Sequence, residues 1–171
     1  AHPNTFILGQ GVDDFKGIFG STTGLADKYG AKRVFDVPLM EEGMTGIAIG
    51  ASLVGDYPIT THIRADFAFL AMNQIINLAS KYRYMFGGIM SCPMLIRLVV
   101  GRSWGQGAQH SQSPQATFAH YPGLTVVMPS TSTVYSNACE RPASVPTPRP
   151  AARRTHRPAP WRAPDSHGRA P

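Results

Sequence analysis

The sequence has few cysteines, few charges and no long hydrophobic run. Its 171 residues include two cysteines, and 15% are charged. Neither Cys92 nor Cys139 belongs to a CxxC pair or to a Cys/His cluster, which argues against a disulfide framework and a zinc site. No apolar stretch approaches the ~20 residues of a membrane span, and the first residues show no basic segment followed by an apolar one. We therefore expect a cytoplasmic protein with no membrane anchor.

Three familiar phosphate-binding or catalytic motifs are also missing. Gly105 and Gly107 lack the third glycine of a dinucleotide fingerprint, and no Gly-Lys-Ser/Thr sequence exists for a Walker loop. The Gly-x-Ser-x-Gly elbow of serine hydrolases does not occur either. These absences argue against a domain that binds phosphates on its own and against acyl-serine chemistry.

The composition changes abruptly near residue 135. Residues 136–171 contain eight prolines, seven arginines and no Leu, Ile, Met or Phe, so this segment cannot bury a hydrophobic core. Residues 1–135 carry 9 Lys and Arg against 8 Asp and Glu, a net charge of +1, whereas residues 136–171 carry 7 against 2, a net charge of +5. We predict one folded domain over residues 1–135 and a disordered Arg/Pro/Ala-rich tail over residues 136–171.

Residues 1–135 alternate between strand-like and helix-like segments. Apolar or β-branched runs predict strands at 5–8, 33–37, 58–63, 94–100 and 125–128. Segments that end at glycine predict helices at 22–29 and 41–54, and a three-and-four apolar spacing predicts a helix at 67–82. Such alternation predicts an α/β fold, in which a mainly parallel sheet has helices on both faces. The long loop at 101–123 is expected to be functional.

Ligands of such folds bind beyond the carboxyl ends of the strands, which here means residues 38–43, 64–67 and 101–113. Three side chains in these segments are candidates. On spacing alone, Glu41 is explained by the favourable effect of an acid at a helix start, and Phe67 as a core aromatic. His110 is explained as a solvated loop residue, although histidine is also a natural general acid or base near neutral pH.

Four ordered segments carry a resemblance to a known family. They read PLMEEGMTGIAIG at 38–50, AMNQIINLASKYRYM at 71–85, GAQHSQS at 107–113 and PGLTVVMP at 122–129. Together they resemble the beta subunit of thiamine-diphosphate-dependent 2-oxo acid dehydrogenases, over about residues 5–135. The resemblance implies a transketolase-like pyrimidine-binding domain, with the cofactor lying between this domain and a separate alpha subunit.

The resemblance assigns a role to each candidate. Glu41 matches the glutamate that contacts the aminopyrimidine ring of thiamine diphosphate and activates the cofactor. Phe67 matches the aromatic residue that stacks on that ring, and His110 matches an active-site histidine that handles proton transfer or orientation near the substrate and the lipoyl group. The implied reaction is oxidative decarboxylation of a 2-oxo acid, with pyruvate favoured, followed by reductive acylation of a lipoyl group.

The resemblance also implies partners. No Gly-Asp-Gly type motif occurs in this sequence, so the diphosphate and its Mg²⁺ would be held by the alpha subunit, and this chain would itself hold no metal. A second beta subunit and a lipoyl-bearing acyltransferase would complete the assembly. Branched-chain 2-oxo acids and acetoin remain open as alternative substrates.

Residues 136–171 leave two further alternatives open. The family continues beyond residue 135 with a helix and a C-terminal domain, whereas this composition is what an out-of-frame reading of a GC-rich gene would give. A truncated and inactive chain and a natural disordered tail are both compatible with it. The tail's arginines and Trp161 could also contact phosphates, as in a non-catalytic nucleic-acid-binding module. We expect the enzyme subunit instead, because four family segments in order are a specific signal.

Overall fold

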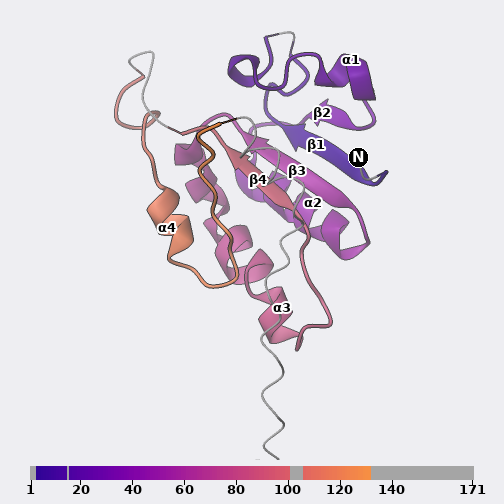
Figure 1. The fold of residues 1–171 in the computed structure, drawn as a ribbon, viewed down its shortest axis with the longest axis vertical. Coiled ribbons are helices and arrows are strands. Elements are labelled where there is room, and N and C mark those ends of the chain that lie inside the picture. Colours follow the sequence, from indigo (N-terminus) through magenta and orange to yellow (C-terminus); the bar gives the residue numbers. More distant parts are fainter. Residues whose placement is uncertain (1–2, 15, 101–105, 132–171) are drawn as a thin grey trace, which may run out of the picture.

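Four strands form one parallel sheet in the computed structural model, which describes residues 3–14, 16–100 and 106–131. They are β1 (Thr5–Gly9), β2 (Val34–Asp36), β3 (Tyr57–His62) and β4 (Leu95–Leu98), arranged in the order β2-β1-β3-β4 (Figure 1). All three pairings are parallel, with Leu8 opposite Thr60 and Thr60 opposite Ile96. The predicted α/β fold with a parallel sheet is confirmed. The predicted tail at 136–171 lies outside the described residues.

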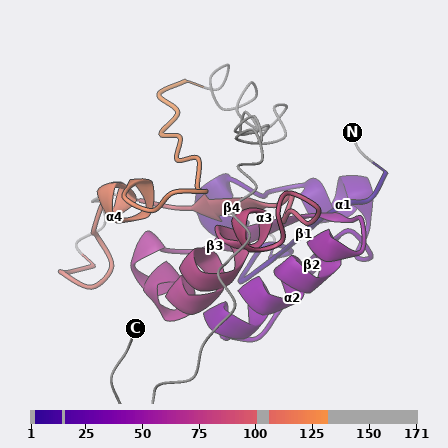
Figure 2. The same ribbon diagram turned by 90° about the horizontal axis from the view of Figure 1, so that it is seen from below.

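Helices cover the two faces of the sheet unequally. The helix α2 (Glu41–Leu53) and the helical segments η2 (Ala65–Ala71) and η3 (Asn73–Ala79) pack together on one face (Figure 2). The short helix α1 (Leu25–Tyr29) packs on the other face, near β2. Three further short helical segments are η1 (Ile18–Gly20), α3 (Tyr82–Met85) and α4 (Gln115–Ala119). Within the described residues, no helix has the length and apolar character needed to cross a bilayer.

The alternation of side chains along β1 explains how both faces are held. Leu8 is fully buried and packs on Met44 and Ala48 of α2. Its neighbour Ile7 points to the opposite face, where it packs against a cluster that contains Val34. Full burial of a large aliphatic side chain contributes about 1.5–3 kcal/mol to stability. Residues adjacent in the sequence of β1 therefore stabilise contacts with helices on opposite faces of the sheet.

The helix predicted at 41–54 is confirmed as α2, whereas the one predicted at 67–82 is not one regular α-helix. The structure has a 3₁₀ segment, η2, followed by a π-helical segment, η3, in which the Ser80 N–H donates to the carbonyl of Ile75 five residues earlier at 3.0 Å. These turns rotate side chains differently from an α-helix. Ala68 and Ala71 are therefore buried, while Leu70 is 61% exposed, although the three-and-four apolar spacing from Phe67 places it on the buried face of an α-helix.

The strand predicted at 125–128 is wrong, because these residues pair with no strand in the part of the chain that is described. Gly123, with φ 94°, approaches the Ser80 carbonyl so closely that no side chain fits between them. The adjacent Leu124 packs on the cluster that contains Ile75. Contact with the helical layer thus fixes this segment, and β4 stays at the edge of the described sheet.

Candidate active site

A cavity of about 500 Å³ lies beyond the carboxyl ends of β1 and β3, where the fold predicts a ligand site. Four parts of the chain line it: the loop after β1, the start of α2, the segment from β3 into η2, and the loop before α4. The lining residues are Gln10, Phe19, Leu39, Glu41, His62, Ile63, Arg64, Phe67, Leu70, Gln106 and His110. The structure therefore brings Glu41, Phe67 and His110, the three residues singled out in the sequence, to one cavity. Their individual roles stay predictions.

Glu41 is the first residue of α2 and is only 8% exposed. The Thr45 hydroxyl donates to the Glu41 main-chain carbonyl at 2.8 Å, which ties down the first turn of the helix. Among the described residues, no hydrogen bond or ion pair engages the Glu41 carboxylate. The neighbouring Glu42 differs, because it is exposed and its carboxylate accepts a hydrogen bond from the Gln74 amide at 2.8 Å. Glu41 is therefore a mostly buried residue at the cavity wall whose carboxylate is available to a ligand.

Phe67 and His110 are the two ring-bearing candidates in the lining. Phe67 lies in η2, and His110 follows a turn in which its N–H donates to the Gly107 carbonyl at 3.3 Å. The two rings meet edge to face, with centroids 5.0 Å apart and planes inclined by 71°. This contact holds the loop histidine against the aromatic wall of the cavity.

Arg64, the second residue after the end of β3, is 4% exposed although it is charged. Its Nη2 donates to the Gln106 side-chain oxygen, and its guanidinium lies 4.5 Å from the centroid of the Phe19 ring. Phe19 adopts φ 50° and ψ 37°, a left-handed conformation that costs a non-glycine residue on the order of 1–3 kcal/mol. No carboxylate lies within ion-pair distance of Arg64 in the described residues.

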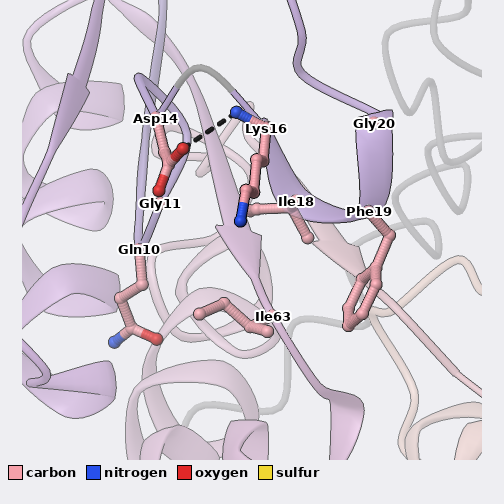
Figure 3. A pocket seen from close by; sticks show the side chains of 9 residues that line it. Gln10, Gly11, Asp14, Lys16, Ile18, Phe19, Gly20 and Ile63 are labelled. Atoms are coloured by element: carbon pink, nitrogen blue, oxygen red, sulfur yellow. Dashed lines mark hydrogen bonds between the residues drawn. The ribbon is translucent and has the colours of Figure 1, made fainter. Parts of the chain in front are cut away.

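A second cavity of about 440 Å³ adjoins the first and is formed mainly by the loop after β1 (Figure 3). Gln10, Phe19 and Ile63 line both cavities. In this loop the Asp14 carboxylate accepts a hydrogen bond from the Lys16 main-chain N–H at 2.8 Å (Figure 3). The two cavities therefore share one wall.

The end of β2 anchors the loop that carries Gln10. The Asp36 carboxylate accepts hydrogen bonds from the N–H groups of Gly11 at 2.8 Å and Val12 at 2.6 Å. Gly9 approaches the Thr61 carbonyl too closely for any side chain, so β1 and β3 stay together at their carboxyl ends. These contacts hold the start of the loop in place beside the cavity.

His62 and Asp66 add buried polar groups near the same wall. His62 is 1% exposed, and burial lowers its pKa from 6.5 to about 4, so its ring is neutral near neutral pH. Asp66 is 7% exposed and its Oδ1 accepts a hydrogen bond from the Gln112 N–H at 3.2 Å. In the described ranges, no three His, Cys, Asp or Glu side chains gather into a cluster that could hold a metal ion.

Four polar residues of the cavity lining were not among the site residues predicted from the sequence: Gln10, His62, Arg64 and Gln106. The signal for two of them was present, because Gln10 directly follows β1 and Arg64 is the second residue after β3. Polar side chains at the carboxyl ends of parallel strands are candidates by position alone. Gln106 carried no comparable signal, since it meets Arg64 across 42 residues of sequence.

Comparison with known proteins identifies the class to which this arrangement belongs. The sequence pattern of the transketolase pyrimidine-binding domain matches residues 1–160, and the chain belongs to this family. The parallel sheet and the cavity at its carboxyl edge agree with that membership.

Individual relatives narrow the similarity to the beta subunits of 2-oxo acid dehydrogenases. The mitochondrial pyruvate dehydrogenase E1 component subunit beta-2 of Oryza sativa subsp. japonica is 43% identical over 129 residues, which are 75% of this chain and 34% of that protein. The mitochondrial 2-oxoisovalerate dehydrogenase subunit beta of Dictyostelium discoideum is 49% identical over 126 residues, 73% of this chain and 34% of that protein. The 2-oxoisovalerate dehydrogenase subunit beta of Bacillus subtilis is 44% identical over 126 residues, which are 74% of this chain and 38% of that protein. The chain thus spans about a third of the length of these relatives, and the resemblance to this class of subunit is confirmed.

Proposed function

We propose that this chain acts as the cofactor-activating part of a beta subunit of a 2-oxo acid dehydrogenase. In this role it supports oxidative decarboxylation and reductive acylation of lipoyl groups. The observation that carries the proposal is Glu41, a mostly buried residue at the cavity wall whose carboxylate has no partner within the described residues, with Phe67 and His110 lining the same cavity. Family membership and the named relatives support the same conclusion.

The cavity fits the aminopyrimidine end of thiamine diphosphate. Its volume of about 500 Å³ lies in the range of small-molecule sites, ~300–1,000 Å³. The Glu41 carboxylate supplies an acceptor for a protonated ring nitrogen, and Phe67 with Leu39 and Leu70 supplies apolar surface for a flat ring. When bound, thiamine diphosphate supplies a nucleophilic carbon and an electron sink for the loss of CO₂.

Each residue of the chain has a distinct task in this proposal. Glu41 holds or shares a proton at the ring nitrogen, because its carboxylate lies in the cavity lining without a partner in the described residues. Phe67 sets the orientation of the ring. His110, whose ring meets Phe67 edge to face, moves or holds a proton on the side where the substrate reacts.

The remaining components belong to other chains in this proposal. The diphosphate and its Mg²⁺ are held by an alpha subunit, and a second beta subunit and a lipoyl-bearing acyltransferase complete the assembly. Pyruvate is the proposed substrate, while relatives named for pyruvate and for 2-oxoisovalerate match this chain comparably well. A cytoplasmic location stays a prediction.

The test replaces Glu41 and uses its sequence neighbour as the control. Glu41→Gln keeps the size of the side chain but cannot hold the ring's proton, so exchange of the C2 hydrogen of bound thiamine diphosphate should slow by about 10²–10⁴-fold in the complex with an alpha subunit. Glu42→Gln, a change to an exposed side chain of the same kind, should leave that exchange near the wild-type rate. Equal exchange rates in wild type and Glu41→Gln, at saturating cofactor, would contradict the proposal.

A further inference from the structure

Unpartnered polar nitrogens gather on one wall of the cavity. Arg64 Nε, Gln10 Nε2 and both ring nitrogens of His62 are buried without a hydrogen-bond partner. The three side chains are only 4%, 6% and 1% exposed, and all line the cavity. A buried donor left unpaired costs about 1–3 kcal/mol, so several on one wall indicate that a ligand satisfies them.

The hydrogen-bonding groups and the charge of Arg64, Gln10 and His62 indicate a ligand that is a negatively charged hydrogen-bond acceptor. Arg64 carries a permanent positive charge, Gln10 Nε2 is a donor, and the neutral His62 ring can donate one N–H. Arg64 is already placed by Gln106 and by the Phe19 ring, which are both uncharged. A buried guanidinium without a counter-ion in the described residues is an energetically costly arrangement unless an anion joins it.

The acids nearest in the fold do not supply that anion. Glu41 lines the same cavity, and Asp66 lies two residues after Arg64, but neither forms an ion pair with Arg64. One oxygen of Asp66 accepts the Gln112 N–H, and the other is buried without a partner. The Arg64 Nε–H therefore remains available for an acceptor that enters the cavity.

We propose that Arg64 and Gln10 form a subsite for a carboxylate of the 2-oxo acid, beside the cofactor-activating residues. A guanidinium pairs well with a carboxylate because its N–H groups match the two oxygens in a plane. The subsite positions the substrate, and it rests on the proposed function for the identity of that substrate. Two sources share this chemistry: the carboxylate next to the reacting carbonyl, and a distal carboxylate on a dicarboxylic 2-oxo acid.

Binding to the full chain tests the subsite without any activity. In ¹⁵N spectra, the Arg64 Nε–H signal, identified by its loss in Arg64→Met, should shift saturably on addition of pyruvate. The matched control is Arg83→Met on α3, outside the cavity lining, which should leave the shift unchanged. A saturable shift with both pyruvate and 2-oxoglutarate assigns the carboxylate beside the carbonyl, and a shift with 2-oxoglutarate alone assigns the distal one. No saturable shift with either probe overturns the proposal.

Kinetics in the complex with an alpha subunit separate this subsite from cofactor activation. Arg64→Met should raise KM for the 2-oxo acid by roughly tenfold or more, as expected for a lost hydrogen bond to a charged group, while exchange of the cofactor's C2 hydrogen stays unchanged. Arg64→Lys, which keeps the charge but loses the fork, should fall between wild type and Arg64→Met. An unchanged KM in both variants overturns the subsite and leaves the proposed function standing. If the Arg64 signal shifts saturably but the complex with an alpha subunit shows no exchange of the cofactor's C2 hydrogen, the proposed function is overturned and the subsite stands.

Discussion

His62 should make the stability of the domain fall as the pH falls from about 6.5 to about 4. Burial without a partner for either ring nitrogen lowers its pKa from 6.5 to about 4. In that range the unfolded chain binds a proton that the folded chain does not, so acid favours the unfolded state. Each pH unit between the two pKa values changes the free energy of unfolding by about 1.4 kcal/mol, which gives a total loss of about 3 kcal/mol.

The measurement is urea unfolding followed by circular dichroism at several pH values from above 6.5 down to about 4. Other groups also titrate in this range, so the informative quantity is the difference between wild type and His62→Leu, which cannot take up the proton. His120→Leu is the matched control, because His120 is exposed at the end of α4. The wild type and the His120 variant should lose about 3 kcal/mol more than the His62 variant as the pH falls. Parallel curves for wild type and His62→Leu would refute this account of His62.

Two further substitutions test the site and the fold. His110→Ala should impair transfer to lipoyl groups or substrate turnover more than it weakens thiamine diphosphate binding, which steady-state kinetics and calorimetry measure separately; a large loss of cofactor affinity with normal turnover at saturation would argue against the proposed role. Gly123→Ala should lower the free energy of unfolding by more than about 1–3 kcal/mol, because a positive φ and contact with the Ser80 carbonyl act together, whereas Gly87→Ala, with φ 61° and open space around it, should cost about 1 kcal/mol.

The sequence predicted those elements whose signals are local. The helix at 41–54 lies between Pro38 and Gly55, and Gly55 adopts φ 104° just after the observed helix, as a helix-ending glycine does. The segment at 125–128 shows the opposite case. Its apolar residues are typical of a strand, but the contact of Gly123 with Ser80, 43 residues earlier, sets its path, and no local pattern reports such a contact.

The residues of the candidate site also fall into those that a local sequence signal predicts and those that depend on distant contacts. Glu41, Phe67 and His110 could be predicted because they lie in segments that resemble one family and follow strands at one edge of the sheet. Arg64 had the positional signal of a residue close after β3, but its burial could not be predicted, since an arginine in a sequence is usually exposed. Its burial depends on a phenylalanine held at φ 50° in one loop and a glutamine in another, both brought to the end of β3 only by the complete fold. A buried cation at Arg64 without a counter-ion in the described residues is unfavourable, and a bound anion that stabilises the guanidinium would account for it.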